Sequence, residues 1–326
     1  MVDFPYKKEF INPLELWANI INSESTNEQF AEMKNIHVLK TKRGWHSIPH
    51  KYKWSYCNKP TAIVVKKNAY DKIDILVDFF SEEARVKANR KNKLSPYDFY
   101  NLHYDKVSTK AKELQNNCNE INFNYYLREA IYTLNPECNA FKISVTKTFL
   151  QHIGAKKVLD PSAGWGDRLL GAAAANVEVY HGVEPNPRLI NPYEDMLKFV
   201  NKNSYKFFAE DFLKVKLESK YDTIFTSPPF FDYEVYNMED INQSINKRNK
   251  LDVWIKEFLY PYVEKAWEVL VPGGHYALYI SDTKNMQYVE ELCNYIKAKL
   301  KGNLLGIIAI TDEDFSHAFP LWVWRK

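Results

Sequence analysis

From residue 156 onward, short apolar runs rich in Val, Ile, Tyr and Phe alternate with longer stretches in which apolar residues recur at helical spacing. This alternation is typical of a parallel sheet with helices on both faces. The apolar runs predict seven strands, at Lys157–Asp160, Val177–Glu184, Tyr205–Ala209, Tyr221–Thr226, His275–Ser281, Leu305–Ile310 and Leu321–Arg325. Only a polar segment separates the last two strands, so we expect them to form an antiparallel pair.

Helical segments are predicted between these strands and directly before the first of them. Their ranges are Ala140–Ile153, Arg168–Ala175, Trp254–Leu270 and Tyr288–Leu300. Together with the strands, they predict an α/β domain over residues 139–326.

Residues 1–138 mix helical and strand signals, and we expect them to form a small α+β accessory region. The predicted helices are Pro13–Asn22, Thr26–Met33, Ser81–Asn92 and Ser108–Asn116. Two apolar runs, Thr61–Val65 and Ile73–Val77, are predicted to pair as strands.

The composition is that of a globular protein, because 45% of the 326 residues are hydrophobic and 26% are charged. The chain has no apolar run of membrane-spanning length, and its first residues lack the features of a signal peptide. The four cysteines stand far apart without a CxxC pair, which argues against a disulfide framework or a zinc site. We therefore expect a cytoplasmic protein without a metal or a membrane anchor.

Positive charge is concentrated near the start of the chain. Residues 33–70 contain nine Lys or Arg and no Asp or Glu, which indicates a polyanionic partner. Aromatic residues are interleaved with these cations, as at surfaces that bind phosphates and stack bases. The candidate contacts to nucleic acid are Lys42, Arg43, Trp45 and Trp54. The alternative is a solvated basic loop whose aromatic residues belong to the core.

The first predicted strand of the α/β domain ends in the sequence Asp160-Pro-Ser-Ala-Gly164-Trp-Gly166, which leads into a helix. Glycines at this turn let a ligand approach the backbone, and the helix that follows presents free N–H groups. The segment is not a P-loop, and Leu169 stands where a dinucleotide fingerprint needs its third glycine. An acid at position 160 would oppose a pyrophosphate but suits a ligand with an ammonium group.

This segment resembles motif I of class I S-adenosylmethionine (SAM)-dependent methyltransferases, which implies a Rossmann-like fold and SAM as cofactor. The resemblance implies that Asp160 and the glycine loop hold the methionine portion of SAM. It also implies that Glu184 accepts from the ribose hydroxyls and that Asp211, or else Glu210, accepts from the adenine amine. The implied cofactor contacts are Asp160, Ser162, Ala163, Gly164, Gly166, Glu184, Pro185, Asn186, Asp211, Phe212 and, from the segment before the first strand, Phe141.

After the fourth predicted strand comes Ser227-Pro228-Pro229-Phe230. It resembles the (Asp/Asn/Ser)-Pro-Pro-(Tyr/Phe/Trp) motif of methyltransferases that modify the exocyclic amine of adenine or cytosine. The earlier segment around the glycine loop, residues 158–172, is also similar to methyltransferases of phages and large DNA viruses. The resemblance implies that Ser227 Oγ and the Pro228 carbonyl accept hydrogen bonds from the amine. The two prolines fix the backbone at this point. Phe230 is expected to stack on an extruded base, with Phe231 and Tyr233 as further substrate contacts.

The resemblance favours DNA as the substrate, with cytosine N4 ahead of adenine N6 because serine occupies the first motif position. RNA is the second candidate, and related tetrapeptides also occur in enzymes that methylate guanine N2 or protein glutamine. A further alternative is a catalytically inactive subunit that binds nucleic acid, and a protein partner or a homodimer also stays open. No long recognition insert follows the motif, so recognition is expected from the accessory region, with residues 232–252 closing over the substrate.

Overall fold

The computed structural model describes residues 3–22, 30–32, 48–66, 70–90, 93–116, 122–231, 234–236, 244–245, 248–282, 286–313, 315 and 317–326. Lys42, Arg43, Trp45 and Tyr233, which were predicted to contact the substrate, lie outside these residues.

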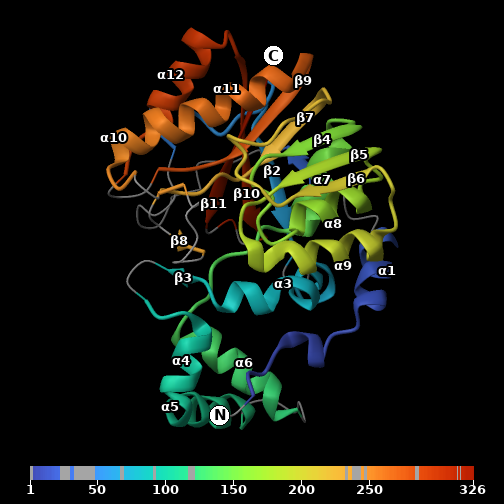
Figure 1. Cartoon of the computed structure of the whole chain (residues 1–326), viewed down its shortest axis with the longest axis vertical. Coiled ribbons are helices and arrows are strands. Elements are labelled where there is room, and N and C mark those ends of the chain that lie inside the picture. The colour runs from blue at the N-terminus through green and yellow to red at the C-terminus, as the bar shows by residue number, and fades with distance from the viewer. Residues whose placement is uncertain are drawn as a thin grey trace.

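A nine-stranded sheet forms the centre of the molecule (Figure 1). From one edge to the other its strands are β1 (Phe30–Glu32), β2 (Thr61–Val65), β10 (Asn303–Asp312), β11 (Ala318–Arg325), β9 (Leu270–Tyr279), β7 (Tyr221–Thr226), β4 (Lys157–Asp160), β5 (Val179–Val183) and β6 (Tyr205–Phe208). Strands β9, β7, β4, β5 and β6 are parallel, and β11 runs antiparallel to both of its neighbours. The predicted α/β fold is confirmed, and all seven predicted strands are present.

The order in which the strands are added to the sheet reverses at β4, because β5 and β6 lie on one side of it while β7 and β9 lie on the other. In open α/β sheets, ligands bind outside the carboxyl ends of the strands at such a switch point. The topology therefore places the segments after β4, β5, β6 and β7 around one potential binding site.

Helices cover both faces of the sheet (Figure 1). One apolar core lies against α7 (Ile143–His152), α8 (Asp167–Ala174) and α9 (Ile190–Val200). The second core lies against α10 (Leu251–Trp254), α11 (Tyr260–Val269) and α12 (Val289–Lys299). Trp322 and Trp324 of β11 and Tyr262 of α11 are fully buried in this second core.

The first 138 residues contribute both helices and strands. Their helices are α1 (Pro13–Asn22), α3 (Leu76–Val86), α4 (Pro96–Leu102), α5 (Tyr104–Gln115) and α6 (Phe123–Leu134). Figure 1 shows α4, α5 and α6 gathered at the end of the molecule away from the sheet, with α3 between them and α9. Strand β2 pairs in parallel with β10, so strands from this region extend the central sheet.

Three local predictions for this region are wrong. The helix predicted over Ser81–Asn92 ends at Val86, and Asn89–Arg90 form a short strand instead. Ile73–Val77 is not a strand, because residues 70–74 form a π-helical turn and Leu76 begins α3. A short apolar run buried on all sides has no period that separates strand from helix. Of the predicted helix Thr26–Met33, residues 30–32 instead form β1, while 26–29 and 33 lie outside the described residues.

Gly306 joins the accessory region to the sheet. The Ser55 carbonyl accepts from Ile307 N at 2.8 Å, and Cys57 N donates to the Leu305 carbonyl at 2.9 Å. Gly306 has φ +136°, and a Cβ there would lie 1.8 Å from the Ser55 carbonyl oxygen. Only glycine therefore fits at this crossing.

Replacing Gly306 with alanine is expected to lower the melting temperature by roughly 5 °C or more, because the backbone of Ser55 would have to move. Gly273→Ala is the matched control, since Gly273 also has a positive φ of +79° but nothing within 4 Å of the added Cβ. Thermal unfolding of both variants measures the difference. Equal losses in the two variants would show that the close approach at Gly306 does not matter for stability.

Candidate active site

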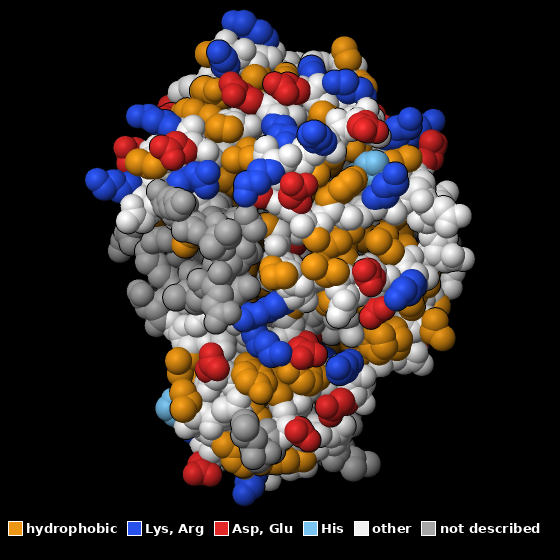
Figure 2. Space-filling model, viewed as in Figure 1, with side chains coloured by type: hydrophobic (Ala, Val, Ile, Leu, Met, Phe, Trp, Pro, Cys, Tyr) orange, Lys and Arg blue, Asp and Glu red, His pale blue; other side chains and the backbone are white. Residues whose placement is uncertain are grey.

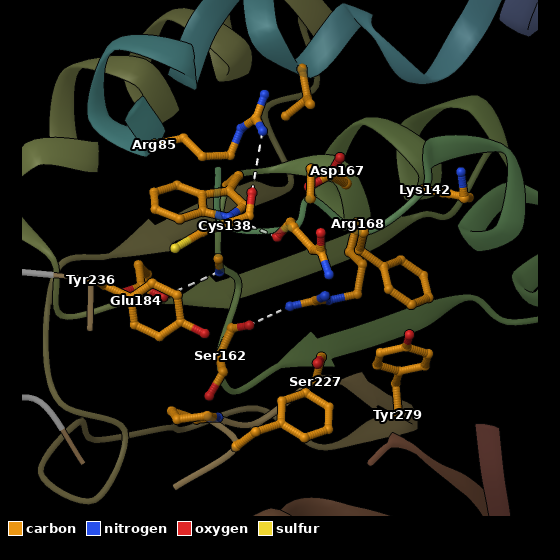
Figure 3. A pocket seen from close by; sticks show the side chains of 18 of the residues that line it. Arg85, Cys138, Lys142, Ser162, Asp167, Arg168, Glu184, Ser227, Tyr236 and Tyr279 are labelled. Atoms are coloured by element: carbon orange, nitrogen blue, oxygen red, sulfur yellow. Dashed lines mark hydrogen bonds between the residues drawn. The ribbon is translucent and has the colours of Figure 1, made fainter. Parts of the chain in front are cut away.

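A cavity of about 680 Å³ opens at the carboxyl ends of β4, β5, β6 and β7 (Figure 3). The predicted site residues that line it are Phe141, Ser162, Gly164, Glu184, Pro185, Asn186, Asp211, Phe212, Ser227, Pro229, Phe230 and Phe231. Asp160, Ala163, Gly166, Pro228 and Trp54 are not among the lining residues. The cavity thus brings the two motifs together although about 60 residues separate them in the chain.

The two glycines of the loop after β4 have different roles. Gly164 has φ +60°, and no atom lies closer than 3.7 Å to a Cβ placed there, so the cavity wall is open at this point. Gly166 has φ +105°, and a Cβ would lie 2.4 Å from Met196 Sδ. Gly166 is therefore needed where α8 begins against α9, and not to admit a ligand.

Asp160 is fully buried behind this loop. One carboxylate oxygen, Oδ2, accepts from Arg168 Nε at 2.7 Å and from the Tyr180 hydroxyl at 2.8 Å. The other oxygen, Oδ1, has no hydrogen-bond partner among the described residues. Arg168 Nη2 also donates to the Ser162 carbonyl, so Arg168 holds the loop to the strand that precedes it (Figure 3).

Glu184, directly after β5, faces the cavity from the other side of the loop. Its Oε2 accepts from Gly164 N at 3.2 Å and its Oε1 from Asn186 N at 3.1 Å. Burial raises the pKa of the Glu184 carboxyl to about 7 because the charged form loses solvation, although these two N–H groups oppose the shift.

Asn186 and Asp211 also line the cavity. Asn186 Nδ2 is buried and has no hydrogen-bond partner in the described part of the chain, so it can donate to a bound molecule. Asp211 Oδ1 accepts from Leu213 N at 2.9 Å. Of the two acids considered for this position, Asp211 lines the cavity, whereas Glu210 is exposed and does not.

A buried tyrosine that the sequence did not single out connects the two motifs. The Tyr262 hydroxyl lies 2.8 Å from Ser162 Oγ and 3.1 Å from Thr226 Oγ1. Thr226 Oγ1 also accepts from Ser162 N at 3.1 Å. This network fixes the end of β4 against the end of β7, and Ser227 follows directly.

Aromatic rings surround Tyr279, on the side of the cavity next to Ser227 (Figure 3). The ring centroids of Phe141, Phe230 and Phe319 lie 5.1, 6.1 and 6.2 Å from that of Tyr279. Phe231 differs from them, because it has φ +49°, is only 8% exposed and packs 5.8 Å from Trp254. Phe231 is therefore mainly a core residue.

The segment after Phe230 crosses to the accessory region. Strand β8 (Glu234–Val235) pairs with β3 (Asn89–Arg90) in a separate two-stranded sheet. Tyr236 then packs 5.7 Å from Trp165, and both rings line the cavity. The described part of the segment that was predicted to close over the substrate thus lies against the cavity wall.

A cluster of six buried charged side chains lies between the accessory helices and the cavity. Arg85 pairs with Asp78 and with Glu137, at 2.8 Å for the latter, and Lys7 pairs with Asp78 at 2.7 Å. Arg128 pairs with Glu82 and Glu137. Three cations thus balance three acids, which makes this burial tolerable. Lys7, Asp78, Arg85 and Glu137 form one wall of the cavity.

The described part of the basic and aromatic segment packs onto the sheet. Trp54 is half-buried against the apolar cores, and Tyr52 lies 5.0 Å from Trp322. These two rings fit the alternative in which the aromatic residues belong to the core. Figure 2 shows Lys and Arg interspersed with Asp and Glu across the described part of the face in view.

None of the helices in the described part of the chain is long and apolar enough to cross a membrane. The same residues contain no group of three or more His, Cys, Asp or Glu side chains that could hold a metal ion.

Among known proteins, this chain matches solved structures but no family model and no curated sequence. TrmN from Thermus thermophilus is 15% identical, with a TM-score of 0.43, and the match covers 58% of this chain and 50% of TrmN. The N-methyltransferase NodS from Bradyrhizobium japonicum, in complex with S-adenosyl-L-homocysteine (SAH), is 12% identical over 55% of this chain and 83% of NodS, with a TM-score of 0.37.

A methyltransferase from Pyrococcus furiosus is 20% identical over 57% of this chain and 83% of its own, with a TM-score of 0.39. The match thus spans only half of TrmN, and little more than half of this chain in each case. The function proposed below therefore rests on the residues of the cavity.

Proposed function

We propose that this protein is a SAM-dependent methyltransferase that modifies an exocyclic amino nitrogen of a base in nucleic acid. The observation that carries this proposal is the shared cavity. It joins a glycine loop and an acid after neighbouring parallel strands to the Ser-Pro-Pro-Phe motif after β7. The first group suits an adenosyl cofactor, and the second suits a planar amine.

The residues around the loop after β4 fit the chemistry of SAM. Glu184 offers carboxylate oxygens to a ribose diol, and Asn186 Nδ2 is a buried donor without a partner. Asp211 also lines the cavity and is proposed to accept from the adenine amine. Bound there, SAM would supply an electrophilic methyl group.

Ser227 is proposed to activate the acceptor. Its side chain lines the cavity and makes no hydrogen bond to the described residues, so Oγ is free to accept from an amine. An exocyclic amine of a base is a poor nucleophile because its lone pair is conjugated with the ring. A hydrogen bond to Ser227 Oγ would draw an amine hydrogen out of the ring plane and help to localise the lone pair. The Pro228 carbonyl was expected to accept a second one, but Pro228 does not line the cavity. Positioning then accounts for most of the rate, since the transfer needs no strong base.

Phe230 and the rings around Tyr279 are proposed to hold the base. Extruding a base from a duplex costs a few kcal/mol, and stacking on an aromatic ring returns about 1–3 kcal/mol. DNA is proposed as the substrate, with cytosine N4 ahead of adenine N6, and RNA is the second candidate.

Methyl transfer from isotopically labelled SAM to duplex DNA, single-stranded DNA and RNA, followed by nucleoside mass spectrometry, tests this function. We expect label in N4-methylcytosine or N6-methyladenine. Label in RNA nucleosides alone would show that the substrate is RNA and not DNA. If SAH binds but no nucleoside is labelled, the nucleic-acid substrate is wrong, and a protein substrate or a required partner protein comes next.

A further inference from the structure

From the sequence, the methionine end of the cofactor was assigned to Asp160. In the structure, the start of α8 is better placed to contact a ligand than Asp160 is. Asp160 does not line the cavity, and its Oδ2 is already bonded to Arg168 and Tyr180. Asp167 and Arg168, the first two residues of α8, do line it.

Arg168 lines the cavity and has a donor that it does not use within the described part of the chain. Its hydrogen bonds to the protein involve Nε, to Asp160, and Nη2, to the Ser162 carbonyl, which leaves Nη1 without a partner among the described residues. A guanidinium is a fork that can bond two acceptors in fixed directions and stays charged when buried. Arg168 is 4% exposed and stacks over the Phe141 ring at 5.4 Å, so the fork is held in place.

Asp167 supplies an acidic group beside Arg168, which a bound ammonium would hold in its ionised form. Asp167 is 2% exposed, and its Oδ1 is buried without a hydrogen-bond partner in the part of the chain that the structure describes. Burial raises the pKa of this carboxyl to about 8, because no neighbour fully replaces the lost solvation. Buried polar atoms are nearly always bonded, so an orphaned carboxylate oxygen in a cavity wall points to a ligand. Figure 3 shows both side chains in the cavity, with Arg168 reaching toward Ser162.

We infer that the amino-acid end of SAM is bound by the first turn of α8, with its carboxylate on Arg168 Nη1 and its ammonium on Asp167. This inference rests on the proposed function. The role of Asp160 is then to position Arg168 from behind, together with Tyr180.

Calorimetric titration with three ligands tests each contact separately. SAH carries both charged groups, its decarboxylated analogue carries only the ammonium, and 5′-methylthioadenosine carries neither. The wild-type protein is expected to bind the decarboxylated analogue about tenfold more weakly than SAH, as for one charged hydrogen bond.

Two variants address Arg168. The double variant Asp160→Asn/Arg168→Gln removes both members of the buried ion pair, so that neither charge is left alone. Arg168→Lys keeps a cation for Asp160 but has no second nitrogen in the fork. Both are expected to bind SAH and its decarboxylated analogue with affinities within about twofold of each other.

Asp167→Asn is the matched variant for the ammonium, because it is isosteric and removes only the charge. It should weaken SAH and the decarboxylated analogue alike, by about tenfold, and leave 5′-methylthioadenosine unchanged. Unchanged affinity for 5′-methylthioadenosine in all three variants shows that the adenosyl site is folded.

The inference is overturned if the wild-type protein binds SAH and the decarboxylated analogue equally, or if the Arg168 variants keep the preference for SAH. It is also overturned if Asp167→Asn binds SAH as tightly as the wild type does. If the wild-type protein binds none of the three ligands, the cofactor itself is wrong, and the proposed function fails with it.

Discussion

Replacing Ser227 with alanine is expected to lower kcat for methyl transfer about a hundredfold while SAH affinity stays within about twofold of the wild-type value. Ser227 Oγ lines the cavity and bonds to no described residue, so its removal disturbs no internal contact. The lost hydrogen bond matters most as the amine lone pair localises, which happens on the way to the transition state. Deleting one oriented contact of this kind in other enzymes lowers kcat by about 10²–10³.

Single-turnover kinetics with labelled SAM, together with calorimetry for SAH, separates the two effects. Ser227→Asn is the matched variant, because its side-chain carbonyl is again an acceptor at this position, and it should recover part of the lost rate. If Ser227→Ala transfers methyl groups at the wild-type rate, Ser227 does not activate the amine and the interpretation of the motif is wrong.

The arrangement of the site could be predicted as far as it follows from strand order. Gly164, Glu184, Asp211 and Ser227 each follow a different strand of a parallel sheet, and the carboxyl ends of such strands meet along one edge. Alternation of apolar runs and helical segments was enough to identify these strands. The shared cavity is a consequence of that topology.

Contacts between side chains distant in the sequence could not be predicted in the same way. Nothing near Tyr262 indicates that its hydroxyl bonds to Ser162 and Thr226, because a buried tyrosine in a helix has many possible partners. The pairing of Arg168 with Asp160 depends on how α8 turns back over β4. The local sequence shows which side chains can form hydrogen bonds. Which partner each one bonds depends on how the helices and strands pack together.

The accessory region was the least predictable part for the same reason. Its buried charges, such as Arg85 and Glu137, look like solvated surface residues in the sequence because charged side chains are seldom buried. They balance one another only after α3 and α6 pack together. Strand β2 likewise finds its partner in β10, about 240 residues later in the chain.

Glu184→Gln is expected to weaken the binding of 5′-methylthioadenosine at pH 8 by about tenfold or more, because a charged acceptor for the ribose hydroxyls is lost. The wild-type affinity should itself depend on pH. Burial raises the pKa of Glu184 to about 7, so the carboxyl of the free protein is mostly protonated at pH 6 and mostly ionised at pH 8. Only the ionised form accepts from both hydroxyls while keeping its bonds to Gly164 N and Asn186 N.

Wild-type affinity for 5′-methylthioadenosine should therefore rise about tenfold between pH 6 and pH 8, whereas Glu184→Gln should show a flat profile. This ligand is chosen because it lacks the ammonium, so ionisation of the nearby Asp167, with its pKa of about 8, contributes little. The stability of the folded protein depends on pH in the opposite direction to the ligand affinity. The folded state holds the Glu184 proton more tightly than the unfolded chain does, so ionisation lowers the free energy of unfolding as the pH rises from about 4.5 to about 7. A variant whose affinity still rises with pH would assign the titration to another group and remove Glu184 from the ribose site.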